Sequence, residues 1–246
     1  MLQPIATQRL YQQVASRIED LIASGKISAG KRLPSEKELA RQLGVSRPTI
    51  REAMIALEIS GLVEVRTGSG IYVSKHTPAR AIILDSGPGP FELLNARLLI
   101  EGEIAANVAV LATPEDVQEI GQTIEEMERV MEEGGHGRDA DQAFHKRIAS
   151  VMGNSVLTGL VETLWSNMFN PMFTKLSERT GLLRNQEATV RDHKAILAAI
   201  ATGDALGART AMRQHLLRVK ETLSGEHESA SVGAADEART AKVRAK

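Results

Sequence analysis

One aspartate and three histidines have residue types and spacings that suit metal coordination. Asp141 and His145 are four positions apart in DADQAFH, so a helix over this segment would present both on the same side. His193 in RDHKAIL and His215 in AMRQHLL lie in two later segments with helical periodicity. A carboxylate and three imidazoles form a ligand set for a divalent ion, with Zn²⁺ as first choice and Ni²⁺ or Mn²⁺ as alternatives. Such a set leaves room for a small molecule only on a five- or six-coordinate metal.

The competing interpretation is that each histidine is an ordinary surface or core residue of an amphipathic helix. The chain has six histidines, and the other three are His76, His136 and His227. These fall in a predicted linker, a loop and the C-terminal tail, and we assign them no role.

A second group of residues could read DNA. Residues 44–65, GVSRPTIREAMIALEISGLVEV, place Arg47 and Arg51 one turn apart on a helix whose other side is apolar. Arginine suits bidentate bonding to guanine O6 and N7. Ser46 and Thr49 are short donors that suit phosphate at a helix N-terminus. The alternative is a pair of solvated helix charges, and the elements on either side of the stretch favour DNA reading.

Those elements are three helices and a hairpin. Helical spacing of apolar residues covers residues 10–24 and 34–43, and a third helix covers about residues 47–60. Ser35 and Glu38 have the spacing of a capping box for the second helix. The runs LVEVRT and GIYVSK then alternate like two strands, joined by Gly68-Ser69-Gly70. This order predicts a winged helix-turn-helix domain over residues 1–74.

The second half of the chain has no strand pattern. Residues 75–90 are rich in proline and glycine, which indicates a linker. Thr113 and Asn154 are candidate N-caps in the region that follows. Helical periodicity covers residues 91–111, 114–134, 139–152, 154–168, 182–201 and 204–224. The fold class is therefore mainly α, with an all-α antiparallel bundle over residues 91–224 and a disordered tail over residues 225–246.

Charge and composition narrow the class of protein. Residues 1–80 hold 12 Lys and Arg against 7 Asp and Glu, a net charge of +5, whereas the remainder has a net charge of −6. This asymmetry suggests two domains with different partners. The chain has no cysteine, no apolar run of membrane-spanning length and no signal-peptide core, so we expect a cytoplasmic protein.

Residues 32–73, RLPSEKELARQLGVSRPTIREAMIALEISGLVEVRTGSGIYV, resemble the winged-helix DNA-binding domain of GntR-family transcription regulators. The family pattern has RLPSE, then VSRxTxREA, then a hairpin with a glycine turn. The resemblance implies DNA contacts from Lys37, Ser46, Arg47, Thr49, Arg51 and Gly68, and Arg66 lies beside the hairpin turn. The family often has arginine at the position of Lys37, and lysine cannot make the bidentate contact that arginine makes. The resemblance also implies a palindromic operator and a homodimer.

The second half resembles the FCD ligand-binding domain, the sensor of the FadR branch of this family. The matching segments are ARLLIEGEIAANVA (96–109), DQAFHKRIA (141–149), RDHKAILAAI (191–200) and DALGARTAMRQHL (204–216). Metal-containing members have DxxxH on one helix and single histidines on two later helices. Asp141, His145, His193 and His215 occupy those positions.

Further segments look like the hexuronate regulators of that branch, the glucuronate, fructuronate and galacturonate repressors. They are GPFELLNARLLIE (89–101), FNPMF (169–173) and AMRQHLLRVKETL (211–223). The implied function is repression of sugar-acid catabolism genes, relieved by a sugar acid that chelates the metal. Within the same class, lactate, pyruvate or gluconate is the alternative effector. Arg97 could pair with the effector carboxylate or with Glu101, and Asn167 and Asn170 are candidates for sugar hydroxyls.

The rival class is a metalloenzyme, such as a sugar-acid isomerase or hydrolase fused to a binding module. Asp and His ligands could hold a metal that activates water. However, no additional carboxylate is spaced as a general base beside these ligands, and the chain has no nucleophile motif. We therefore expect a regulator and not an enzyme.

Overall fold

The structure is a computed structural model that describes residues 8–66, 68–75, 87–182 and 186–225. Most of the predicted linker and all but the first residue of the predicted tail lie outside the described residues, as does Thr67. The chain divides into two compact units, residues 1–92 with 169–175 and residues 93–168 with 176–246. Each unit is described by itself below.

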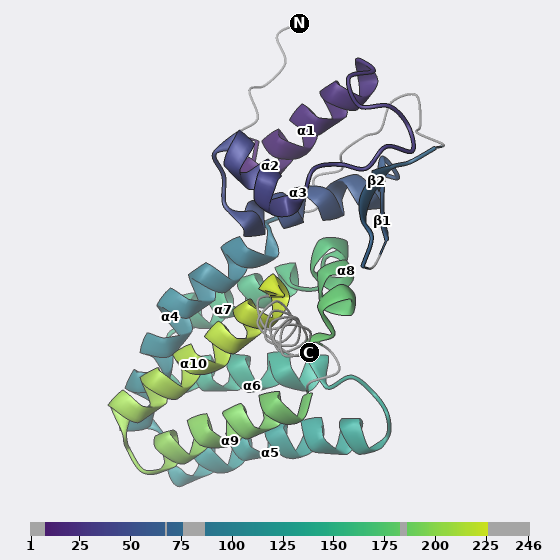
Figure 1. The fold of residues 1–246 in the computed structure, drawn as a ribbon. Helices are drawn as coiled ribbons and strands as arrows, with labels where there is room; N and C mark the ends of the chain where they lie inside the picture. The colour runs from purple at the N-terminus through teal and green to yellow at the C-terminus, as the bar shows by residue number, and fades with distance from the viewer. Residues whose placement is uncertain (1–7, 67, 76–86, 183–185, 226–246) are drawn as a thin grey trace, which may run out of the picture. The chain divides into compact units, whose positions relative to one another are not determined.

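The first unit is a winged helix-turn-helix, as the sequence predicts (Figure 1). Its core forms where α1 and α2 pack on α3, and Ile50, Met54 and Leu57 of α3 are fully buried there. The two strands pair antiparallel, with Val63 opposite Val73. The elements are α1 (Leu10–Ala23), α2 (Glu36–Leu43), α3 (Arg47–Ile59), β1 (Val63–Arg66) and β2 (Gly70–Val73).

The turn between α2 and α3 follows from its local sequence. Gly44 ends α2 at a φ of 67°, a left-handed conformation that glycine adopts without steric cost. The hydroxyl of Ser46 then accepts the Thr49 N–H and caps α3. At the start of α2, Ser35 caps the Glu38 N–H as predicted. The reciprocal half of the predicted capping box is wrong, because the Glu38 carboxylate accepts from Arg41 and Gln42.

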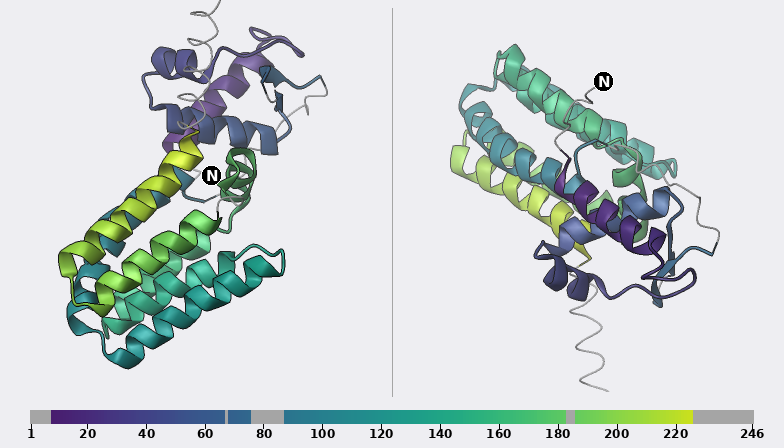
Figure 2. Two further views of the ribbon diagram at one scale, coloured as in Figure 1. Left: turned by 60° about the horizontal axis from the view of Figure 1, so that its bottom comes forward. Right: turned by 90° about the horizontal axis from the view of Figure 1, so that it is seen from above.

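The second unit is an antiparallel helical bundle in which α5 packs on α6 and α9, α6 on α7, and α9 on α10. Figure 2 (left) shows α9 lying between α5 and α10. Thr113 and Asn154 cap α5 and α7 as predicted. The helices of the chain after the linker are α4 (Pro90–Leu111), α5 (Pro114–Glu132), α6 (Arg138–Val151), α7 (Ser155–Asn167), α8 (Pro171–Thr180), α9 (Gln186–Ala201) and α10 (Ala205–Ser224).

Helix α8 is an addition to the six helices that the sequence predicts for this half. It is ten residues long, and its start is well capped. The side-chain oxygen of Asn170 accepts the Phe173 N–H at 2.8 Å, and Pro171 occupies the first helical position. None of the helices in the described part of the chain combines the length and apolarity needed to cross a membrane.

Candidate metal centre and nucleic-acid interface

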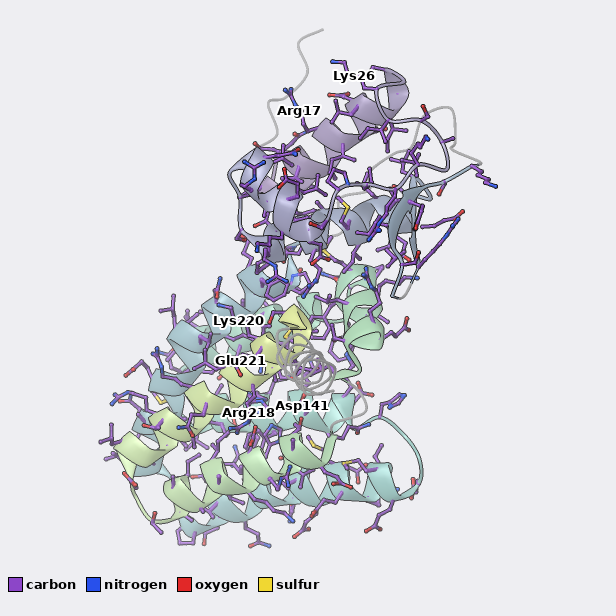
Figure 3. The ribbon with its side chains drawn as sticks, in the orientation of Figure 1. Arg17, Lys26, Asp141, Arg218, Lys220 and Glu221 are labelled. Atoms are coloured by element: carbon purple, nitrogen blue, oxygen red, sulfur yellow. The ribbon has the colours of Figure 1, made fainter. Side chains whose placement is uncertain are left out.

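The structure brings Asp141, His145, His193 and His215 together inside the second unit. Helix α6 presents the first two from adjacent turns, and α9 and α10 contribute one histidine each. One ligand atom from each of the four residues can be chosen such that all lie within 4.8 Å of one another. Figure 3 labels Asp141 on α6. The four residues therefore converge as their spacing on predicted helices suggests.

The atoms in this cluster fit a bound cation. His145 Nε2 and His193 Nε2 lie 3.4 and 3.3 Å from Asp141 Oδ1. Asp141 Oδ1 and both ring nitrogens of His193 are buried, and among the described residues they have no hydrogen-bond partner. An unsatisfied buried polar atom costs about 1–3 kcal/mol, which a coordinated metal would offset. The cluster could therefore hold a divalent metal ion, and its N₃O donor set suits a borderline one.

Two carboxylates outside the cluster orient its histidines. Glu101 Oε2 lies 2.5 Å from His145 Nδ1, and Asp192 Oδ2 lies 3.3 Å from His215 Nδ1. Each contact occupies Nδ1 and leaves Nε2 as the ligand atom, an arrangement common around metal-binding histidines. Arg218, labelled on α10 in Figure 3, holds Asp192 in turn.

The sequence did not reveal these orienting roles. From the sequence, Glu101 is expected only as a partner of Arg97, and Asp192 has no expected role. Asp192 adjoins His193 in the sequence but contacts His215 on the next helix. The adjacent Asp-His pair is a weak signal, because it does not say which histidine the carboxylate serves.

Burial and neighbouring charges set the protonation of the cluster. Burial lowers the pKa of His193 to about 3 and also lowers the pKa of His215, so both rings are in the neutral, metal-binding form. Burial also acts to lower the pKa of His145, but the negative charge of Glu101 outweighs it and the net shift is upward. For Asp141, burial acts to raise the pKa, while the neighbouring rings of His145 and His193 bring it well below its usual range.

Of the two contacts expected for Arg97, the structure shows the ion pair with Glu101. Its Nε donates to Glu101 Oε1 at 2.6 Å, and the whole side chain is buried. Its Nη2 lies 3.4 Å from His145 Nε2, and its guanidinium lies 4.1 Å from the centre of the Trp165 ring. The ion pair with Glu101 therefore forms, and it leaves the arginine directly beside the candidate metal centre.

The contacts of the two asparagines do not connect them to the cluster. Asn167 Nδ2 donates to the Thr163 carbonyl of its own helix, α7. Asn170 caps α8, donates to the Pro88 carbonyl and belongs to the first unit.

In the first unit, the N-terminal turn of α3 carries the predicted DNA contacts. Arg47 and Ser46 are exposed there, and the Ser46 and Thr49 hydroxyls lie 2.8 Å apart. Lys37 is exposed near the start of α2. Arg51 differs, because it is half-buried and forms an ion pair with a carboxylate of α2.

The hairpin turn carries the remaining predicted contacts. Gly68 is exposed and has a φ of 72°. The Arg66 guanidinium lies 3.2 Å from the Glu64 carboxylate and 4.3 Å from the centre of the Tyr72 ring. These contacts hold Arg66 beside the turn at the tip of the wing.

A winged helix whose recognition helix exposes Arg47 in its first turn, followed by a helical unit with a buried ligand set, defines a DNA-binding regulator with a sensor domain. Residues 10–73 match the model for bacterial regulatory proteins of the gntR family, and residues 92–218 match the FCD domain model. The chain belongs to the GntR family of transcription regulators and carries an FCD domain. It is a DNA-binding regulator and not an enzyme.

The chain is similar to two Escherichia coli K12 regulators over most of its length. It is 41% identical to the Uxu operon transcriptional regulator, covering 89% of this chain and 88% of that protein. It is 38% identical to the Exu regulon transcriptional regulator, covering 89% of this chain and 86% of that protein. Among solved structures, E. coli McbR/YncC is 22% identical with a TM-score of 0.50, covering 90% of this chain and 100% of that one, which supports the fold alone.

Proposed function

We propose that this regulator represses genes for the catabolism of a sugar acid of the hexuronate class and that the sugar acid releases it from DNA. The observation that carries this proposal is the buried Arg97 guanidinium beside His145 Nε2. A fixed positive charge next to a candidate metal site suits a ligand that has both a carboxylate and a metal-binding oxygen. The similarity to Uxu and Exu regulators favours a uronate as that ligand.

The effector site combines a metal with this arginine. Asp141, His145, His193 and His215 hold one divalent ion per chain, for which Zn²⁺ is our first choice over Ni²⁺ or Mn²⁺. The carboxylate and a neighbouring hydroxyl or keto oxygen of the sugar acid would bring the number of ligand atoms from four to six. Arg97 bonds the carboxylate from the side.

Asn167 and Asn170 remain predicted contacts to sugar hydroxyls. Their side chains would have to exchange the backbone hydrogen bonds described above for bonds to the ligand. Replacing each by alanine in the release assay described below tests them directly.

DNA reading is assigned to the first two turns of α3, to Lys37 of α2 and to the wing. Arg47 and Arg51 read guanine from the major groove, while the Ser46 and Thr49 hydroxyls and Lys37 contact phosphates. Arg66 and Gly68 approach the minor groove. We propose that the chain acts as a homodimer on a palindromic operator, because the symmetry of such regulators matches that of their sites.

The test begins with a duplex selected from a random DNA library by full-length, Zn²⁺-loaded protein. Release of this duplex is followed by fluorescence anisotropy as glucuronate, fructuronate, galacturonate, lactate, pyruvate or gluconate is added, with and without a chelator. We expect a uronate to release the DNA only when metal is present. Release by lactate, pyruvate or gluconate instead would favour the alternative effector, and release by a uronate that survives chelation would refute the metal role.

Arg97→Lys and Arg209→Lys form a matched pair in this assay. Arg209 also pairs with a glutamate of α4, Glu103, but on the exposed surface. We expect Arg97→Lys to raise the effector concentration needed for release by about tenfold or more, since lysine cannot make a bidentate contact. Arg209→Lys should behave like wild type, and equal behaviour of the two variants would refute the role of Arg97.

A further inference from the structure

An ion pair joins the two helices of the DNA-reading motif. Arg51 Nη2 lies 2.7 Å from Glu36 Oε2, and Arg51 Nε donates to Glu36 Oε1 at 3.3 Å. Glu36 is the first residue of α2, and Arg51 lies in the second turn of α3. The two side chains are only 18% and 15% exposed. The Glu36 carboxylate therefore binds one edge of the Arg51 guanidinium, which is the group expected to contact guanine.

The negative charge of the Glu36 carboxylate opposes DNA binding. The surrounding surface has to approach phosphates, and a negative side chain there weakens non-specific attraction. A structural explanation is that Glu36 stabilises the N-terminus of α2, whose first turn also contains Glu38. Stabilisation of the helix N-terminus would not require Glu36 to contact both Nε and Nη2 of Arg51 on the neighbouring helix.

This two-point contact between Glu36 and Arg51 has a direct consequence for base recognition. A bidentate bond to guanine needs the guanidinium plane in one orientation, and a free arginine side chain loses about 2 kcal/mol of rotamer entropy when it is fixed. Binding Arg51 through Nε and Nη2 fixes that plane before DNA arrives. Arg47 differs, because it is exposed and forms no ion pair within the part of the chain that the structure describes.

We propose that Glu36 is a positioning residue that orients Arg51 and thereby sets the base preference of the regulator. The inference rests on the proposed reading of DNA by α3. Glu36 lowers affinity for random DNA through its charge and raises discrimination through its geometry. The quantity that it controls is thus the ratio of the dissociation constants for random and selected duplexes.

The experiment uses the full-length chain and two duplexes, the one selected from the random library by wild-type protein and a scrambled duplex of the same composition. Glu36→Asp keeps the charge but shortens the side chain, so it breaks the two-point contact with Arg51. Glu36→Gln removes the charge. We expect both variants to lower the specificity ratio by about tenfold, the scale of one bidentate base contact. Only Glu36→Gln should bind the scrambled duplex more tightly than wild type.

Glu38→Gln is the matched control. Glu38 lies on the same helix and accepts from Arg41 through Nε and Nη2 at 3.0 and 2.6 Å, but both side chains belong to α2. It should leave the specificity ratio unchanged. A repeated selection with Glu36→Asp gives a second readout, in which one guanine position per half-site should lose its preference. Thermal unfolding of each variant confirms that it folds.

Arg51→Lys separates failure of this inference from failure of the proposed DNA reading. If Arg51→Lys leaves the ratio at the wild-type value, Arg51 does not read a base and the proposed reading by this residue is wrong. If Arg51→Lys lowers the ratio while Glu36→Asp and Glu36→Gln do not, the positioning role is wrong. In the Arg51→Lys background, either change at Glu36 should have no further effect on the ratio, and an additional loss there would also overturn the inference.

Discussion

His145 Nδ1 lies 2.5 Å from Oε2 of Glu101, and both side chains are buried. The other oxygen of Glu101 accepts a hydrogen bond from Arg97 Nε, so the carboxylate is itself held in place. Burial acts to raise the pKa of Glu101, but Arg97 and His145 outweigh it and hold the pKa at about 2. Glu101 is therefore a fixed negative charge that directs the Nε2 atom of His145 towards the other candidate ligands.

Glu101→Gln should weaken metal binding by about 10- to 100-fold, the usual effect of removing a carboxylate behind a ligating histidine. Competition between the protein and a chromophoric chelator measures the affinity. Glu103→Gln, two positions along α4 and in an exposed pair with Arg209, is the control and should bind metal like wild type. Equal affinities of the two variants would exclude an orienting role for Glu101.

The single tryptophan of the chain should report on metal binding. The Trp165 ring centre lies 5.0 Å from that of His145. Open-shell ions quench an excited indole at such short range, so Ni²⁺ should strongly reduce the fluorescence, whereas closed-shell Zn²⁺ should not. Zn²⁺ added first should prevent the loss, because both ions compete for one site.

His193→Ala provides the control for this titration. It removes a candidate ligand on α9, whereas the ring that contacts Trp165 remains in place. The variant should lose the tight phase of quenching. Undiminished tight quenching in His193→Ala, supported by full metal content in elemental analysis, would place the metal elsewhere.

Local pattern was enough to predict the elements that hold both sites. The spacing of Asp141 and His145 fixes their common side on one helix, and capping by Ser46 fixes the start of α3. Helix α8 lies outside the predicted helices, although Asn170 and Pro171 are a local start signal of the same kind. Contacts between helices have no such signature.

The orienting carboxylates illustrate this limit. Asp192 reaches a histidine 23 positions away on the next helix, and Arg51 reaches a glutamate 15 positions away on the preceding one. Each contact depends on how two helices are rotated against one another, which packing decides. The sequence therefore indicates the residues that can bind a ligand more readily than those that orient them.

Glu52 should make the stability of the first unit depend on pH. It is 7% exposed on α3, and its carboxylate accepts the Phe91 N–H at 2.9 Å. Burial is the main cause that raises its pKa from 4.5 to about 7, with a smaller contribution from the charge of Glu92. The folded state thus binds this proton more tightly than the unfolded state. The contribution of this proton to the free energy of unfolding is fully present below pH 4.5 and is lost as pH rises through 7.

Glu52→Gln should therefore unfold with less pH dependence than wild type between pH 5 and 8. At about 1.4 kcal/mol per pKa unit, the difference reaches about 3 kcal/mol as an upper estimate. Denaturant unfolding followed by circular dichroism at a series of pH values measures it. Glu64→Gln, at an exposed position of β1, should keep the wild-type pH dependence. Parallel curves for wild type and Glu52→Gln would show that the buried carboxyl does not titrate in this range.

Arg47 and Lys37 should differ in the kind of DNA affinity that they supply. Arg47 is exposed in the first turn of α3, where it can reach a base edge, and Lys37 is exposed on α2. Arg47→Ala should cost about 1–3 kcal/mol of binding to a selected duplex while hardly changing binding to a scrambled one. Lys37→Ala should weaken binding to both duplexes and reduce the salt dependence by about one phosphate contact.

Fluorescence anisotropy at several salt concentrations distinguishes these outcomes. Since both side chains are exposed, neither substitution should change thermal unfolding by more than a few tenths of a kcal/mol. If Arg47→Ala lowers the salt dependence and weakens both duplexes equally, Arg47 is a phosphate contact. Base reading would then have to come from Arg51 and the wing, and the orientation that Glu36 gives to Arg51 would dominate the choice of operator.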